Sequence, residues 1–106
     1  MAKYLYLASY TSEGLKGLLK DGGSRRRKDL GAAVKEMNGT LETLYFAFGQ
    51  NNVSSIVDLP DNVSAATIAL KISASGAAKV TTVVLLTPEQ IDEATKISVS
   101  YRPPGQ

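Results

Sequence analysis

The residues best suited to chemistry lie in segment 22–28, where two glycines and a serine are followed by four consecutive cations. Glycines before a helix leave backbone N–H groups free for an anion, so Arg25 or Arg26 could hold a carboxylate, a phosphate or an enolate. Cations in a first helical turn oppose the helix dipole, at about 0.3–1 kcal/mol each when exposed. The alternative is that the helix continues through the glycines, and that the cations are solvated or pair with Asp21, Asp29 or a neighbouring subunit.

The tyrosines form a second group of candidates, with five in the chain. Tyr6 and Tyr45 lie on expected strands, and their phenols could point into a cavity as hydrogen-bond donors to a substrate oxygen. Strand tyrosines also pack into cores with only the polar tip in contact with water. Both interpretations stay open at this point.

Histidine and cysteine are both absent, which removes the side chains behind most catalytic and metal-binding sites. Imidazole serves as general base, proton shuttle and metal ligand near neutral pH, and the thiolate serves as nucleophile and soft ligand. The acidic residues show no EF-hand spacing, and haem would need a tyrosine, lysine or methionine ligand. The Gly-Gly-Ser run lacks the spacing of a P-loop or of a dinucleotide-binding motif. We therefore expect no metal and no cofactor.

The composition is that of one ordinary globular domain spanning residues 1–106. Apolar residues make up 43% of the chain and charged residues 21%, both typical of soluble domains. Twelve Lys and Arg against ten Asp and Glu give a net charge of +2, too near balance for nucleic acid or an anionic membrane as the main partner. The longest apolar runs are too short to span a bilayer, and residues 1–8 do not form a secretory signal. We expect a cytoplasmic protein.

Residues 3–10 predict a strand with large side chains on both faces. Tyr4 and Tyr6 alternate with Leu5 and Leu7, whereas a strand that is covered on one side only shows a clean apolar–polar alternation. We therefore expect both faces of this strand to be covered.

Two helical segments are predicted after this strand. The first follows the N-cap candidates Thr11 and Ser12, and the glycine pair interrupts it before Ser24 caps the second. The second segment carries apolar residues at helical spacing and stops at Asn38-Gly39. Its apolar stripe consists of Leu30, Ala33, Val34 and Met37.

The second half of the chain predicts a hairpin, a helix, a further strand and a short final helix. Thr87-Pro88-Glu89-Gln90 is a capping box with proline at the first helical position, which is a strong start signal. Residues 98–101 could add a short strand before a rigid tail. The other elements are strands 40–48 and 53–59 joined by the turn 49–52, a helix capped at residues 60–62 and ended by Gly76, and a strand over 78–86.

This order predicts an α+β fold, the ferredoxin-like βαββαβ unit with a four-stranded antiparallel sheet and a short C-terminal helix. Right-handed crossovers place both long helices on one face of the sheet. The tyrosine, phenylalanine and valine side chains of the opposite face would then form a large exposed apolar patch. We expect a second copy of the chain to cover it, giving a homo-oligomer, with a dimer that encloses a barrel-like cavity as the first expectation.

Five segments, spread in order over nearly the whole chain, are similar to one family. They are Tyr10–Leu18, Gly22–Arg26, Tyr45–Gly49, Leu59–Asp61 and Leu86–Glu89. In these segments the chain resembles the GYD domain proteins. The resemblance implies a fold of the dimeric α/β-barrel superfamily, whose members include cofactor-free oxygenases, lactone isomerases and ligand-sensing domains. It implies a ligand cavity between helices and sheet or between sheets, but it does not select a reaction.

The chain departs from the family at the motif behind the family name, a Gly, a variable residue and Tyr-Asp at the hairpin. Here Gly49 and Gln50 are followed by Asn51 and Asn52. The chain therefore offers neither a phenol nor a carboxylic acid at this place. An amide can still hydrogen-bond a ligand, or simply hold the turn.

The function that we favour from the sequence is non-catalytic binding of an anionic or aromatic organic molecule by an oligomer. The alternative is a cofactor-independent oxygenase or isomerase, in which Tyr or Asn orients the substrate and Arg stabilises developing negative charge. A third possibility is a purely structural partner protein. Catalytic residues stay unassigned, and the residues expected nearest the ligand are Arg25, Arg26, Tyr6, Tyr45, Asn51 and Asn52.

Overall fold

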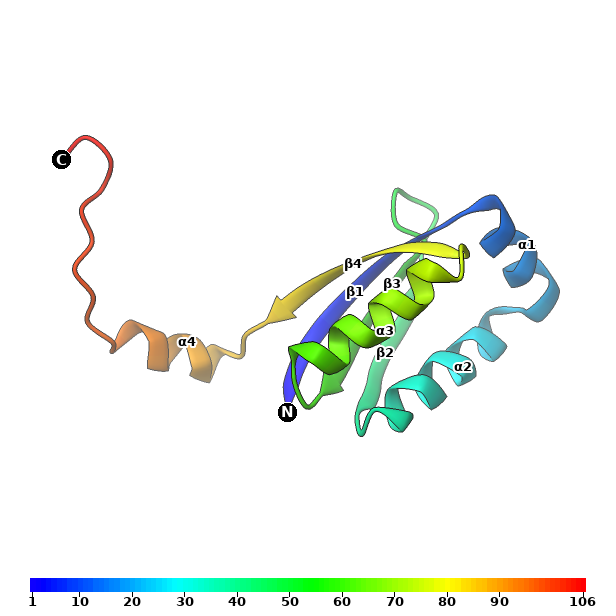
Figure 1. Ribbon diagram of the computed structural model, residues 1–106, viewed down its shortest axis with the longest axis horizontal. Helices are drawn as coiled ribbons and strands as arrows, with labels where there is room; N and C mark the ends of the chain where they lie inside the picture. Colours follow the sequence, from blue (N-terminus) through cyan, green and yellow to red (C-terminus); the bar gives the residue numbers. More distant parts are fainter.

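The computed structural model describes all residues from 1 to 106. It consists of one antiparallel sheet with three helices packed on one face and a fourth helix set apart from them (Figure 1). The elements are, in chain order, β1 (Ala2–Tyr10), α1 (Ser12–Asp21), α2 (Gly23–Glu36), β2 (Thr40–Phe46), β3 (Val53–Leu59), α3 (Asn62–Ala74), β4 (Ala78–Leu85) and α4 (Pro88–Thr95). None of the helices combines the length and the apolar character that crossing a bilayer requires.

The strands lie in the order β2-β3-β1-β4, and every neighbouring pair is antiparallel. The two central strands are β1 and β3, so Tyr6 of β1 lies between Ser55 and Thr82. This order and the βαββαβ succession confirm the predicted ferredoxin-like α+β fold. The predicted hairpin is also present, because β2 and β3 are adjacent.

The glycine pair separates two helices. Gly22 has a φ of 83°, a conformation open to glycine but strained for other residues, and it ends α1. The helix therefore does not continue through the glycines. Ser24 was predicted to cap the second helix, but it lies inside α2, which begins at Gly23 without a side-chain cap.

Two strand predictions need correction. Residues 98–101 form no strand, because the chain has left the sheet at that point and has no strand beside it to pair with. The strand predicted over 40–48 ends at Phe46, and residues 47–52 form the hairpin loop in which Phe48 is fully exposed.

The core lies between the sheet and the helices. Tyr4 and Tyr6 are buried, and each phenol reaches α3: Tyr4 donates to Asn62 Oδ1 at 2.6 Å and Tyr6 to the Ala65 carbonyl oxygen at 2.6 Å. Buried tyrosines of this kind contribute apolar area and satisfy their hydroxyls at the same time. The main cluster consists of Tyr4, Tyr6, Val34, Val57, Leu59, Ala65 and Ile68.

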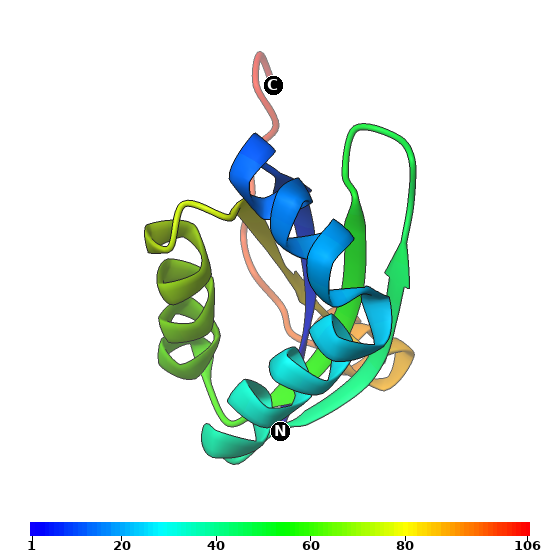
Figure 2. The same cartoon turned by 90° about the vertical axis from the view of Figure 1, so that its right-hand side faces the viewer.

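The opposite face of the sheet carries the alternate residues of the same strands. α1, α2 and α3 lie on the other side (Figure 2), so this face, here called the bare face, is uncovered in a single copy. Lys3 lies at one end of it, paired with Glu42 and, at 2.9 Å, with Asp58. The apolar residues of the bare face are Leu5, Leu7, Ile56, Val83 and Leu85.

The close packing of α1 against Ala77 and Tyr10 depends on the absence of a side chain at Gly14. A Cβ on Gly14 would lie 1.9 Å from the Ala77 carbonyl oxygen, and 2.7 Å from the Tyr10 ring. Because backbone must move to relieve such a clash, we expect Gly14→Ala to lower the free energy of unfolding by about 1–3 kcal/mol. Urea denaturation measures this change.

The matched control is Gly17→Ala on the same helix, where a Cβ meets nothing within 4 Å. There the better helix propensity of alanine should raise stability by up to about 1 kcal/mol. Equal effects of the two substitutions would contradict the packing of α1 described above.

Candidate functional site

A cleft of about 550 Å³ opens between α3 on one side and α1 and α2 on the other, above the sheet. Most of its lining residues are apolar, and its volume is within the range of small-molecule sites. Ala8, Val53 and Ala78 form a small buried cluster at its floor. The cleft is therefore the place in this domain that is best shaped for a ligand.

Small residues on both sides create this space. Ala8 and Ala78 lie on the strands, whereas Gly14, Gly17 and Ala33 lie on the helices. Gly17 has open space where a side chain would project. Since cores are normally packed to high density, a row of such small side chains leaves a hollow that larger ones would fill.

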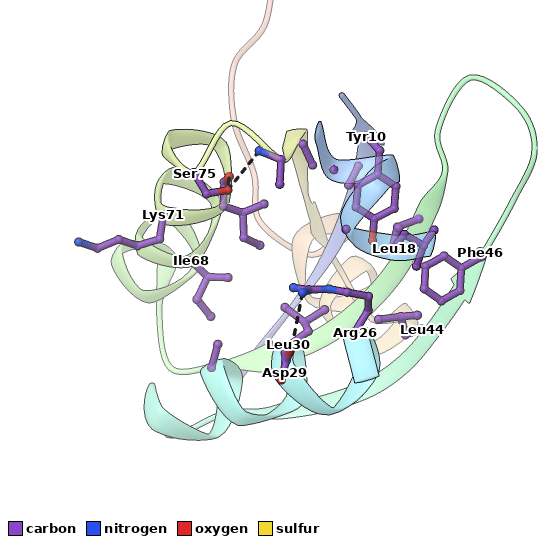
Figure 3. A pocket seen from close by; sticks show the side chains of 18 of the residues that line it. Tyr10, Leu18, Arg26, Asp29, Leu30, Leu44, Phe46, Ile68, Lys71 and Ser75 are labelled. Atoms are coloured by element: carbon purple, nitrogen blue, oxygen red, sulfur yellow. Dashed lines mark hydrogen bonds and ion pairs between the residues drawn. The ribbon is translucent and has the colours of Figure 1, made fainter. Parts of the chain in front are cut away.

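The polar groups of the cleft gather at one wall. Figure 3 shows the Arg26 guanidinium reaching toward the middle of the cleft, between Tyr10 and Asp29. Arg26 Nη1 lies 3.7 Å from Asp21 Oδ2 and 3.4 Å from Asp29 Oδ2. Both distances exceed those of good hydrogen bonds, so the guanidinium retains donors for a further partner. The amine of Lys71 points away from the cleft (Figure 3).

Tyr10 is a hydrogen-bond donor at neutral pH. Burial raises the pKa of Tyr10, and the Arg26 guanidinium beside it acts in the opposite direction. The net effect is a rise, so the phenol keeps its proton and offers an O–H beside a guanidinium. This pair can hold an anionic or carbonyl oxygen.

Of the six residues that the sequence placed near a ligand, Arg26 alone lines the cleft. Arg25 is exposed and binds Asp29, with Nε 3.2 Å from Oδ1. Tyr6 lies beneath α3, where its hydroxyl is already bound to the Ala65 carbonyl. The structure therefore does not bring the predicted group together.

Tyr45 lies on the bare-face side of β2, 71% exposed. The reason is an irregularity in the pairing of β2 with β3 between Leu41 and Thr43. A bulge of this kind inserts one extra residue and moves every later side chain to the other face. Leu44 therefore points to the helices, and Tyr45 points away from them.

Asn51 and Asn52 join the hairpin loop to the end of β1. Asn52 Oδ1 accepts a hydrogen bond from the Tyr10 N–H at 2.9 Å, and the Asn52 N–H donates to the Ala8 carbonyl at 2.8 Å. The Ser9 hydroxyl donates to Asn51 Oδ1 at 3.3 Å. These amides thus hold the strand end from which Tyr10 enters the cleft, and they do not line it themselves.

Sequence reasoning missed Tyr10 and Asp29 as site residues. Tyr10 is four residues after Tyr6 on the same strand. The alternation of side chains along a strand therefore places both tyrosines on the same face of the sheet. The available signal was that Tyr10 lies at the strand end, directly before a helix containing Gly14 and Gly17, whose lack of side chains leaves room beside the phenol.

The comparison with family models decides the identity of the domain. The GYD domain model matches residues 4–95, which run from Tyr4 in β1 to the end of α4. The chain belongs to the GYD domain family. A comparison with curated proteins and one with solved structures found no match.

The alkaline titration of this GYD domain tests how its tyrosines are placed. Burial raises the pKa of Tyr6 from 10.0 to about 12. The unfolded chain therefore releases this proton at lower pH than the folded chain does, so stability falls as pH rises above 10. We expect Tyr6→Phe to weaken that dependence, as measured by urea denaturation at several alkaline pH values.

The tyrosinate absorbance of the folded protein provides the direct measurement. It should show late ionisation of both Tyr6 and Tyr10, and Tyr6→Phe should remove the later of the two steps. If all five tyrosines ionise together near the ordinary value, Tyr6 is not buried beneath α3 as described.

Proposed function

We propose that this GYD domain binds a small organic molecule in the cleft, with an apolar or aromatic body and an anionic group. The observation that supports this most strongly is the position of Arg26 and the protonated Tyr10 together at one wall of an otherwise apolar hollow. Sites for small molecules are typically apolar with a few convergent polar groups.

The two parts of such a ligand would meet different parts of the cleft. Its apolar body would contact side chains such as Leu18, Ile68 and Ile72, at about 25 cal/mol for each Å² removed from water. Its anionic oxygen would accept from Arg26 and Tyr10. Charge-assisted hydrogen bonds of this type are about twice as strong as neutral ones.

The protonated Tyr10 suits binding and also the enzymatic alternative, in which a tyrosine orients the substrate. A phenol whose pKa is raised donates a hydrogen bond at neutral pH but does not abstract a proton. Turnover of a bound compound with oxygen, in the absence of any cofactor, would instead assign the cofactor-independent reaction to the same cleft.

Phenylacetate and its neutral analogue phenylacetamide test the role of Arg26. We expect wild type to bind the acid more tightly, and Arg26→Gln to weaken binding of the acid by about ten-fold or more, because a charged hydrogen bond is lost. The amide should bind wild type and the variant alike. Arg25→Gln, on the same helix but outside the cleft, is the control. Calorimetric titration measures all three proteins.

Gly17→Leu tests the location of the site. Its side chain would enter open space in the cleft, so the fold should persist while binding of both probes is lost. Unchanged binding by this variant places the ligand elsewhere and overturns the proposal.

We further propose that the domain assembles with itself through the bare face. The apolar residues there form a contiguous patch across three strands, and patches of this kind mark interaction surfaces. A second copy offers the same apolar character, as a two-fold interface requires.

Ile56 lies at the centre of that face, between Leu5 and Thr43. We expect wild type to sediment as an oligomer at micromolar concentration and Ile56→Asp to sediment as a monomer, because a charge in an apolar interface is costly. Ala32→Asp, at an exposed position of α2, should behave as wild type. A wild-type chain that is monomeric at these concentrations would refute assembly through the bare face.

A further inference from the structure

The segment that follows β4 projects from the domain and is exposed at every residue except the half-buried Thr87. We call residues 86–106, with α4 and the chain beyond it, the arm. Figure 1 shows the arm leaving the end of the sheet and extending away from α1, α2 and α3. Every residue of α4 is exposed. The large apolar side chains exposed on the arm are Leu86, Ile91, Ile97, Val99 and Tyr101.

A helix as short as α4 needs a surface to pack against. It has eight residues, whereas isolated helices shorter than about 12–15 residues are marginal in water. The capping box formed by Thr87 and Gln90 satisfies its first turn, but capping adds only about 1 kcal/mol. Since the family match runs through Thr95, α4 is part of the domain itself. Its own copy supplies no packing surface.

The radius of gyration and the accessible surface area of a single copy are both larger than a compact domain of this length would have. The radius of gyration is 16.8 Å, against about 13 Å for a compact domain of this length. The accessible surface is 7635 Å², against about 5,700 Å² for a compact monomer of this mass. The excess is about 1,900 Å² per copy, and stable interfaces cover about 800 Å² or more per partner. A large reciprocal interface would account for it.

The arm starts at one end of the bare face. Val83 and Leu85 of β4 point to that face, and Leu86 begins the arm directly after them. Whatever covers the bare face is in position to contact the arm as well.

Charge favours the same partner. α4 contains three acidic residues and no basic one, whereas residues 1–87 carry ten basic residues against seven acidic ones. An acidic helix is therefore attracted by the net positive charge of another copy's body.

We propose that the arm packs on a second copy of this chain, so that two copies clasp each other with exchanged arms. This rests on the assembly through the bare face proposed above. Ile91 and Ile97 become buried against the partner, and α4 obtains the packing that its own domain lacks. The arm then adds a second contact area to the sheet-to-sheet contact.

A pair of variants with equal charge tests the arm. In Ile91→Asp/Ile97→Asp the apolar contacts are removed, and in Ser98→Asp/Ser100→Asp the same charge is added at polar positions of the arm. Sedimentation of a dilution series gives the dissociation constant of the dimer. We expect the isoleucine variant to raise it by about ten-fold or more, since apolar burial is replaced by buried charge. The serine variant should stay closer to wild type. Equal constants for wild type and the isoleucine variant overturn the proposal.

Hydrogen exchange separates the two proposals. In the wild-type dimer the amides of α4 should be protected, and in the monomeric Ile56→Asp variant they should exchange rapidly. A dimer whose α4 amides exchange freely keeps the bare-face assembly but excludes the arm contact. A wild-type chain that stays monomeric removes both.

Discussion

β1 carries large apolar side chains on both faces of the sheet, and the chain provides helices for only one of them. Tyr4 and Tyr6 are covered by α2 and α3 and build the core. Leu5 and Leu7 point to the other face, where nothing in the same copy covers them. Because apolar burial is the main force that stabilises a domain, this imbalance defines the core and the bare face.

The cleft results from the way in which α1, α2 and α3 pack on their side of the sheet. Thr11 caps α1 and its hydroxyl also donates to the Gly76 carbonyl oxygen at 2.6 Å. Gly14 lets the helix approach Ala77 closely. α1 is thus fixed over the end of the sheet, while the small residues behind it leave the hollow open. The same glycine-rich helix provides close packing at one position and empty space one turn later.

The altered family motif fits this arrangement. Asn51 and Asn52 stand where the family name implies a tyrosine and an aspartate, and here their amides bind the ends of β1 and the hairpin together. They orient the strand end that carries Tyr10. In this member of the family, the hairpin therefore supports the wall of the cleft, and the groups that would touch a ligand come from β1 and α2.

The sequence by itself determined the order of the elements, the hairpin, the capping box at Thr87 and the two-sided character of β1, because caps, turns and periodicity are local properties. Tertiary structure alone decided which side chains meet in the cleft. The bulge near Glu42 turned Tyr45 outward, and the packing of α2 over the sheet brings Arg26, and not Arg25, to the cleft. Neighbouring residues on a helix differ by about 100° in direction, so a motif of consecutive arginines cannot show which one faces inward. That choice depends on contacts between segments far apart in the chain.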